Sequence, residues 1–255
     1  MRLQLIRNAT QVLDYAGKRI LLDPYFAPKH SRPSYTGKSP NPLIDLPLPP
    51  ERILAGVQLV IVSHLHSDHF DPVAHELVPK TLPFFCQPGD EQTIRDKGFH
   101  DVTPVVDSIA WNGVTITRIN GYHGMGEVGA MMGRVSGFVF QAQGEPTLYW
   151  AGDTVLCDEV RDAIARFQPV VIVTHSAGAT WPDEAGERHL IVMDAAQTLD
   201  VCRLAAKSVV IAIHLDSLDH GTVSRADLRA QAEQAGIGNL RIPEDGEVIE
   251  IGGSL

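Results

Sequence analysis

Residues 63–69 carry four side chains of the types that bind divalent metals: His64, His66, Asp68 and His69. They follow the apolar run of residues 57–62, which predicts a buried strand that ends in polar side chains. In an extended segment, His64 and His66 project to the same side. Crowded imidazoles and a carboxylate would desolvate one another, and a divalent cation relieves that cost. The alternative is a solvent-exposed, histidine-rich turn.

Three further apolar strands are predicted to end in a metal-binding side chain, namely His123, Asp153 and His214. Each of these residues taken alone is more often structural. Side chains at the ends of strands in one sheet system can converge on a single site, however. Together with the first cluster they make seven ligands, enough for two metals that share a bridging carboxylate. Imidazole and carboxylate ligands suit zinc, with manganese or iron as alternatives.

The elements that must position these residues alternate between strands and helices along one α/β domain, residues 1–255. Apolar runs predict buried strands at residues 170–175 and 209–214, and 3.6-residue spacing predicts helices at 159–167, 194–207 and 225–234. A hairpin is predicted from residues 136–141 and 147–150. A second pair, residues 240–242 and 248–251, is predicted to close the chain across the turn at 244–246.

The composition of the chain indicates which binding partners and which cellular compartment to expect. The net charge of −10 argues against a nucleic-acid partner. The three cysteines are isolated in apolar surroundings, as is typical of buried thiols in a reducing compartment. The chain shows no apolar run that could span a bilayer and no signal-peptide pattern, so we predict a cytoplasmic protein without a membrane partner. The oligomeric state is left open, and a homo-oligomer is compatible with the sequence.

Two segments are candidates for contacting a substrate. Residues 24–50 are proline-rich and carry Lys29, Arg32 and Lys38, with no acidic residue between positions 24 and 44. This segment is predicted to be either a lid over an anionic substrate or a solvated cationic loop. Glycines and methionines of residues 121–137, including Met125, predict a mobile and partly apolar wall beside the site, or a plain flexible loop.

The order of the ligands resembles a known family. The run His64-x-His66-x-Asp68-His69, followed by His123, Gly152-Asp153-Thr154 and His214, is similar to the metallo-β-lactamase superfamily. Within it, the chain most resembles the lineage that includes the ascorbate-6-phosphate lactonase and related metal-dependent hydrolases. The resemblance covers essentially the whole chain. It implies a four-layer αββα sandwich of two mixed β-sheets flanked by helices.

The resemblance also implies a role for each ligand. It assigns His64, His66 and His123 to a first metal, and Asp68, His69 and His214 to a second, with Asp153 bridging the two. Asp23 matches a position where the superfamily often carries an aspartate, and is expected to be a turn former or a carboxylate that orients a ligand. An amidohydrolase barrel is disfavoured because its metal-binding aspartate comes last in the chain. A zincin is disfavoured because the H-E-x-x-H pattern is absent.

The expected activity is therefore that of a dinuclear metal-dependent hydrolase. A bridging hydroxide is the expected nucleophile, and a small anionic lactone, ester or phosphoester is the expected substrate. Asp68 would hold the proton of the nucleophile, and His175 is an outside candidate for the acid, or else a core histidine. Lys29, Arg32, Lys38 and Met125 are candidate substrate contacts. The alternatives are a phosphodiesterase or nuclease that uses the same site, and a non-catalytic metal-binding protein.

Overall fold

Apolar side chains of two β-sheets meet in a buried layer at the centre of the protein. In the computed structural model, which describes residues 1–252, Leu3 and Leu13 of one sheet lie in the same cluster as Phe138, Phe140 and Trp150 of the other. These residues are at most 1% exposed. Burial of this apolar surface from both sheets is the main favourable contribution to folding.

The first sheet has seven strands, with the order β16-β1-β2-β3-β4-β5-β6. The three pairs β16-β1, β1-β2 and β2-β3 are antiparallel, and the three pairs β3-β4, β4-β5 and β5-β6 are parallel. The strands are β1 (Arg2–Arg7), β2 (Thr10–Tyr15), β3 (Lys18–Leu22), β4 (Leu59–Ile61), β5 (Phe84–Cys86), β6 (Val102–Pro104) and β16 (Val248–Glu250).

The second sheet also has seven strands, with the order β15-β14-β11-β10-β9-β8-β7. A separate hairpin is formed by β12 (Thr180–Pro182) and β13 (Arg188–Leu190). The strands of the large sheet are β7 (Ser108–Trp111), β8 (Val114–Tyr122), β9 (Arg134–Gln141), β10 (Leu148–Trp150), β11 (Val171–His175), β14 (Val209–Ile213) and β15 (Leu240–Arg241).

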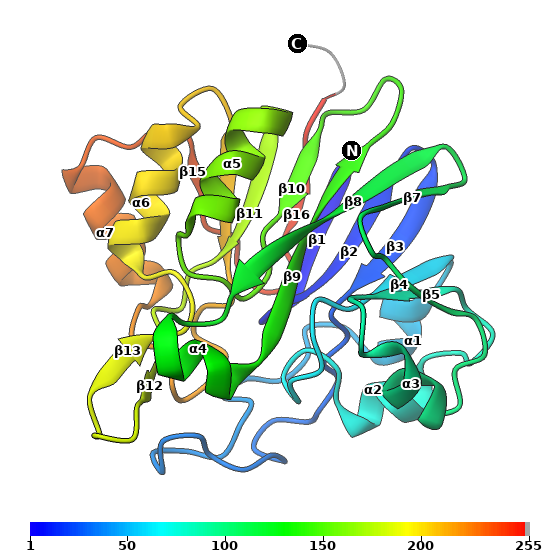
Figure 1. Cartoon of the computed structure of the whole chain (residues 1–255), viewed down its shortest axis with the longest axis horizontal. Helices are drawn as coiled ribbons and strands as arrows, with labels where there is room; N and C mark the ends of the chain where they lie inside the picture. The colour runs from blue at the N-terminus through cyan, green and yellow to red at the C-terminus, as the bar shows by residue number, and fades with distance from the viewer. Residues whose placement is uncertain (253–255) are drawn as a thin grey trace.

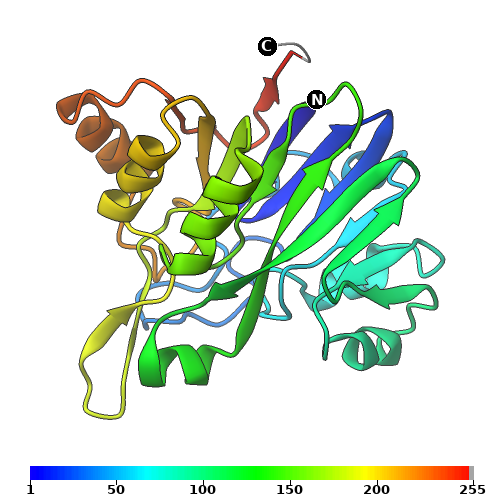
Figure 2. The ribbon, with the colours of Figure 1, turned by 45° about the horizontal axis from the view of Figure 1, so that its top comes forward.

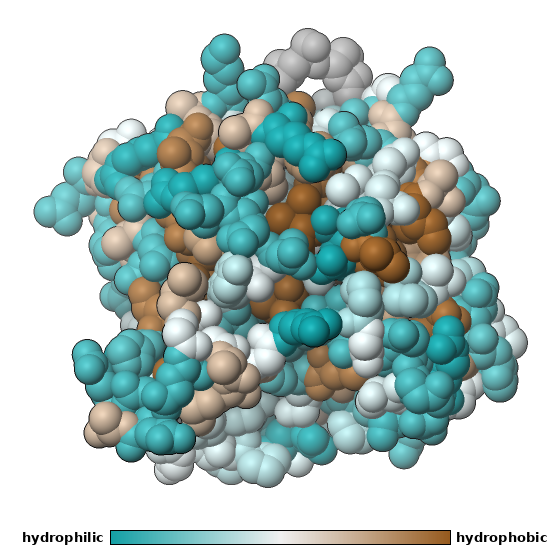
Figure 3. Space-filling model, in the orientation of Figure 1, coloured by the Kyte–Doolittle hydropathy of each residue, from teal (hydrophilic) through white to brown (hydrophobic). Residues whose placement is uncertain are grey.

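Helices cover the outer faces of both sheets (Figure 1). Ile53, Ala74 and Ile94 pack against the first sheet from three helices, α1 (Pro50–Leu54), α2 (Pro72–Leu77) and α3 (Glu91–Asp96). The second sheet is covered by α5 (Asp158–Phe167), α6 (Ala195–Leu204) and α7 (Arg225–Gln234). The predicted sandwich of two mixed sheets between helices is therefore confirmed. Figure 3 shows mostly hydrophilic side chains on one face, with apolar ones in separate patches.

The plain loop considered for residues 121–137 and the pairing expected between the two C-terminal strands are both wrong. The glycine- and methionine-rich segment forms a helix, α4 (Gly126–Met132), because Val128 and Met132 pack against Ala177 and Ile191 and this packing overrides the weak helix propensity of glycine. The two C-terminal strands do not pair with each other. β15 extends the second sheet beside β14, whereas β16 extends the first sheet beside β1.

The predicted ligands and the segments around them lie at one end of the sandwich. Figure 1 shows α4, the β12–β13 hairpin and the loop of residues 24–50 at the same, lower end of the two sheets, and α4 and the hairpin remain at the lower edge in the turned view of Figure 2. The loop of residues 24–50 contains no helix or strand before α1, as predicted, apart from a bridge between Arg32 and Asn41. Within residues 1–252, no helix has the length and apolar character needed to cross a membrane.

Gly137 allows β9 to approach the turn that follows β10. A Cβ atom at this position would lie 2.6 Å from the carbonyl oxygen of Ala151 and 2.8 Å from that of Trp150. Because both contacts are with backbone, we predict that Gly137→Ala lowers the free energy of unfolding by about 1–3 kcal/mol. Urea denaturation measures this change. Gly238→Ala, where a Cβ meets nothing within 4 Å, is the matched control. Equal stability of the two variants would contradict the prediction.

Candidate metal centre

The predicted ligands lie at the ends of strands from both sheets. His64, His66, Asp68 and His69 occupy the loop between β4 and α2. His123, Asp153 and His214 follow β8, β10 and β14 of the second sheet. The packing of the two sheets therefore brings together residues that are as far as 150 positions apart (64 to 214) in the chain. This is the convergence of strand ends that the sequence predicts.

His64, His66 and His123 form the first group. Each has a ring nitrogen within 4.8 Å of the others, and Nδ1 of His66 lies 3.2 Å from Nε2 of His123. The other ring nitrogen of His123, Nδ1, donates a hydrogen bond to the carbonyl oxygen of Ile191 at 2.7 Å, since a carbonyl can only accept. In the neutral ring, Nε2 of His123 therefore carries a lone pair directed at its partners, as a metal ligand must.

Asp23 fixes the orientation of two more imidazoles. Its carboxylate accepts hydrogen bonds from the backbone N–H and the hydroxyl of Ser63, both at 2.7 Å, and from Nδ1 of His69 at 2.6 Å. Because the Ser63 hydroxyl donates to Asp23, it accepts from Nδ1 of His64 at 3.0 Å. Both histidines are thus left with a lone pair on Nε2 when neutral. Asp23 is completely buried, and its predicted role as an orienting carboxylate fits these contacts.

His69, His214, Asp68 and Asp153 form the second group. Nε2 of His69 lies 3.1 Å from Asp153 and 3.5 Å from Asp68, and Nε2 of His214 lies 3.3 Å from Asp68. Asp153 also lies 3.7 Å from Nε2 of His123 in the first group and 3.7 Å from Nε2 of His214. It is therefore the carboxylate between the two groups, as expected of a bridging ligand.

Asp153 is held from behind by His175. The indole N–H of Trp150 donates to Nε2 of His175 at 3.2 Å, so the proton of the neutral ring is on Nδ1, which donates to Asp153 at 2.5 Å. Both ring nitrogens of His175 are occupied, and the ring is completely buried. His175 therefore orients Asp153. It does not line the cavity in front of the two groups, so its geometry offers no contact for the direct acid role that the sequence suggested.

The buried polar atoms of this site fit divalent cations. Nε2 of His64 and both ring nitrogens of His214 are buried without a hydrogen-bond partner. Burial of unpartnered polar atoms is costly, and coordination of a cation removes that cost. His214 and Asp23 also adopt φ values of +65° and +43°, which are unusual for residues with a side chain. Such strain is common where surrounding contacts hold a functional residue in place.

The electrostatics of the two groups differ. Burial lowers the pKa of His64 well below its ordinary value and lowers the pKa of His123 to about 4. Burial also disfavours the charged form of His69, but the carboxylates of Asp153, Asp68 and Asp23 outweigh it and raise the pKa of His69 well above its ordinary value. Asp153 and Asp68 likewise raise the pKa of His214. The second group therefore favours positive charge, as a proton or as a cation.

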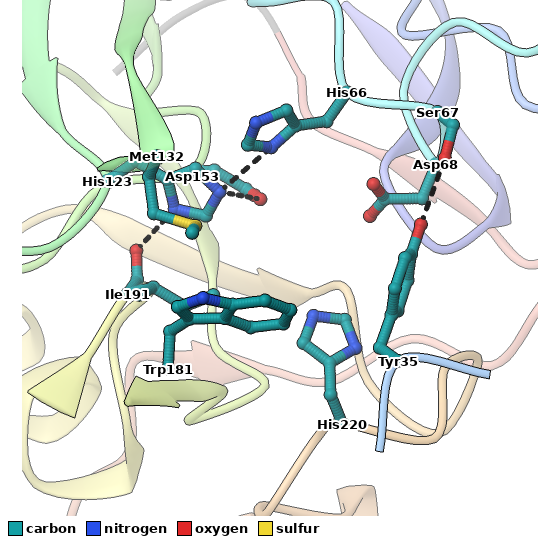
Figure 4. Close-up of a pocket in the computed structure, with 10 residues that line it drawn as sticks. All are labelled: Tyr35, His66, Ser67, Asp68, His123, Met132, Asp153, Trp181, Ile191 and His220. Carbon is teal, nitrogen blue, oxygen red and sulfur yellow. Dashed lines mark hydrogen bonds and ion pairs between the residues drawn. The ribbon is translucent and has the colours of Figure 1, made fainter. Parts of the chain in front are cut away.

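A cavity of about 240 Å³ opens in front of the two groups (Figure 4). His66, Asp68, His123 and Asp153 line one side. Ser67, Met132 and Ile191 also line the cavity, and Met132 belongs to the segment predicted to form an apolar wall. Across the cavity from His66 lie Tyr35, Trp181 and His220, which the sequence did not single out as site residues (Figure 4). The hydroxyl of Tyr35 lies 3.1 Å from that of Ser67, and the rings of Tyr35 and His220 pack edge to face at 4.9 Å.

The predicted substrate residues lie outside this cavity. Lys29 and Lys38 are exposed, Arg32 is half-exposed, and Met125 is 57% exposed. The methionine that lines the cavity is Met132, the last residue of α4, whereas Met125 precedes this helix. Tyr35 lies in the proline-rich loop that the sequence singled out, whereas Trp181 and His220 lie in segments without a motif. No sequence signal identified them.

Comparisons with known proteins agree with this geometry. A family model described as the beta-lactamase superfamily domain matches residues 18–215, which include all seven predicted ligands. The UPF0173 protein YddR of Bacillus subtilis is 35% identical over 254 residues, which are 97% of this chain and 98% of that protein.

Two solved structures are similar over their full lengths. A possible metal-dependent hydrolase from Veillonella parvula has a TM-score of 0.94 and 33% identity, over 98% of this chain and 99% of the other. The isothiocyanate hydrolase from Delia radicum gut bacteria has a TM-score of 0.91 and 34% identity, over 100% of both chains.

The role of Asp23 is testable through metal affinity. In Asp23→Asn the amide N–H would face the N–H of His69 and the hydroxyl of Ser63, so His69 would move its proton to Nε2 and lose its ligand lone pair. We predict a loss of zinc affinity of about 10- to 100-fold, measured by competition with a chelator. Asp200→Asn on α6, where the carboxylate is half-exposed and pairs with Arg203 at 2.7 Å, is the matched control. An unchanged affinity of Asp23→Asn would contradict the assigned role.

The two groups are expected to lose metal at different pH. Because the pKa values of His69 and His214 are raised, these rings keep protons that a cation must displace, so the affinity of the second group falls first as the pH drops. His64 and His123, whose pKa values are lowered, stay neutral to lower pH. Zinc content after dialysis at decreasing pH should therefore fall in two steps.

Single-site variants assign those steps. His214→Ala should remove the step at higher pH, and His123→Ala the step at lower pH, with circular dichroism confirming that each variant is folded. Loss of the first group's ion before that of the second would show that the assignment is wrong.

Proposed function

Because this chain belongs to the β-lactamase superfamily, we propose that it is a dinuclear metal-dependent hydrolase, and that its substrate is a small electrophile with an apolar substituent, an isothiocyanate in particular. The names of its relatives support the hydrolase activity, since solved structures of similar chains are described as a possible metal-dependent hydrolase and as an isothiocyanate hydrolase. Zinc is the proposed metal, with manganese or iron compatible with the same ligands.

The lining of the cavity is the observation that carries the proposed substrate class. The apolar side chains of the lining are Trp181, Met132 and Ile191, and within residues 1–252 no lysine or arginine lines this space. A volume of about 240 Å³ accommodates a small molecule. Apolar walls with a few polar groups at one end suit a substrate whose reacting atoms are uncharged and whose substituent is apolar.

Two groups of ligands that share Asp153 support the dinuclear arrangement. When bound, divalent cations at such a site lower the pKa of a coordinated water and polarise the electrophile. The protein groups that surround them are fixed before the substrate arrives, because each histidine of known tautomer is held by a hydrogen bond. Such preorganisation reduces the reorganisation that the reaction requires.

The side chains in the cavity supply the proton transfers. The carboxylate of Asp68 can hold the proton of the attacking water or pass it to the leaving group, the role that the sequence suggested. The imidazole of His220, on the opposite wall, is placed to deliver a proton to the leaving nitrogen, and Figure 4 shows its ring between Trp181 and Tyr35 with one nitrogen toward the cavity. Tyr35, paired with Ser67, is a second hydrogen-bond donor there.

The reaction balances without any further reactant. Water adds to the central carbon of R–N=C=S, so that a C–O bond forms, the C=N π bond breaks, and nitrogen takes up a proton. The O–H proton of the resulting thiocarbamic acid then moves to nitrogen as the C–N bond breaks, which yields an amine and carbonyl sulfide. With the same groups, water could add to the carbonyl carbon of a lactone or ester or to the phosphorus of a phosphoester, the substrates that the sequence suggested. Those substrates therefore belong in the test.

Turnover of allyl isothiocyanate by the zinc-loaded protein, followed by the release of amine, tests the proposal. A panel of an anionic lactone, a carboxylic ester and a phosphodiester is measured in parallel. We expect the isothiocyanate to have the highest kcat/KM. Asp153→Ala should lower it by at least about a hundredfold, more than the loss of a residue that only orients a ligand.

Asp162→Ala, on the exposed side of α5, is the control for Asp153→Ala and should keep full activity. Hydrolysis of the phosphodiester without hydrolysis of the isothiocyanate would replace the proposed function with the nuclease-type alternative. Tight zinc binding without turnover of any substrate would favour a non-catalytic metal-binding protein.

A further inference from the structure

A second cavity adjoins the first across a wall of three side chains. Tyr35, Trp181 and His220 line both the cavity of about 240 Å³ at the metal-binding groups and an outer one of about 500 Å³. We refer to the outer one as the outer pocket. Figure 4 shows the three rings side by side at the edge of the inner cavity. The outer pocket therefore begins on the far side of the rings that close the inner cavity.

The outer pocket is cationic, in contrast with the inner cavity. Its lining includes Lys38 and Arg188, together with threonine hydroxyls and no acidic residue from the described part of the chain. Neither cation forms an ion pair within residues 1–252. Glu187 directly precedes Arg188, but it is exposed and does not line the outer pocket, and Asp183 is paired with His189 at 2.9 Å. Two unpaired cations in one pocket of a chain with a net charge of −10 point to an anionic ligand.

Arg188 is oriented for such a ligand. Its Nε donates to the hydroxyl of Thr180 at 2.8 Å, and one terminal nitrogen donates to the carbonyl oxygen of Thr180 at 2.6 Å. These bonds tie the guanidinium to the opposite strand of the β12–β13 hairpin. The remaining donors of the guanidinium have no partner in the described residues, and guanidinium groups bind carboxylates well.

The loop that carries Lys38 is held in place by Asp219. The carboxylate of Asp219 accepts hydrogen bonds from the backbone N–H of Tyr35 at 3.0 Å, from the hydroxyl of Thr36 at 2.7 Å and from the amide of Asn41 at 2.9 Å. Because Asp219 directly precedes His220, the same contacts fix the wall between the two cavities. The outer pocket is thus built from segments that are tied to one another.

We propose that the outer pocket is a subsite for a carboxylate at the far end of the substrate, whose reacting carbon lies in the inner cavity. This inference rests on the proposed function, because it takes the inner cavity as the place of reaction. The subsite makes the apolar inner lining compatible with the expected anionic substrate. The anionic group would lie at Lys38 and Arg188, on the far side of the three aromatic rings. Of the three cations suggested by the sequence, Lys38 alone belongs to this lining.

A matched pair of substrates tests the subsite in the zinc-loaded protein. The carboxylate ω-isothiocyanatobutanoate and its methyl ester share the reacting group and differ in the distal charge. We expect kcat/KM to be about fivefold higher for the carboxylate, the size that a solvent-accessible ion pair contributes, and the difference to shrink as salt is added. The preference should appear in KM, with similar kcat values for both substrates.

Three variants locate the preference. Lys38→Gln and Arg188→Gln should each raise KM for the carboxylate and leave the ester unaffected. Lys29→Gln, which removes an exposed cation outside both cavities, should keep the wild-type preference. Arg188 also binds the hairpin, so Arg188→Gln could act through the hairpin structure. Lys38→Gln is therefore the more informative single variant, because the side chain of Lys38 forms no ion pair in the described residues. A preference that survives in the double variant Lys38→Gln/Arg188→Gln overturns the inference.

The outcomes separate the subsite from the proposed function. If the wild type hydrolyses both substrates equally well, the subsite is refuted and the function stands. If it hydrolyses neither, the function fails, and the subsite is judged by binding of hexanoate, measured by quenching of Trp181 fluorescence with Trp181→Phe as the reference. Quenching in the wild type that weakens in Lys38→Gln supports the subsite, and equal or absent quenching in both overturns it.

Discussion

The site depends on one buried carboxylate, that of Asp23. It accepts three hydrogen bonds, two from Ser63 and one from His69, and through the Ser63 hydroxyl it also sets the proton position of His64. One side chain at the end of β3 therefore decides which nitrogen faces the site in both groups of ligands. The orientation of His64 and His69 is therefore set by the first sheet before any cation binds.

The second sheet likewise contains buried side chains that hold a predicted ligand in place. Trp150 and His175, from adjacent parallel strands, hold Asp153 from behind, and Asp153 lies between the two groups of histidines. The two sheets thus each deliver ligands with a buried partner that fixes their direction. Close packing of the central layer keeps these parts in register, because interiors of this density deform little.

The ligands could be predicted from the sequence because their residue types are rare at strand ends and do not depend on the details of packing. The sequence does not decide whether Asp23 orients a ligand or forms a turn, since a position before Pro24 also suits a turn former. The aromatic wall could not be predicted: Tyr35 and His220 lie in loops and Trp181 in the hairpin strand β12, and their convergence depends on tertiary contacts such as those of Asp219. Likewise, α4 forms where glycine content predicts a loop, because Val128 is buried there.

The bond between His123 and Ile191 connects the ligand set to the substrate side of the cavity. Ile191 directly follows β13, packs beside Trp181 and lines the cavity, while its carbonyl oxygen holds the ring of His123 at 2.7 Å. Any shift of the hairpin on substrate binding also turns the imidazole. Occupancy of the cavity and occupancy of the first group of ligands are then reciprocally coupled, each changing the affinity of the other by the same factor.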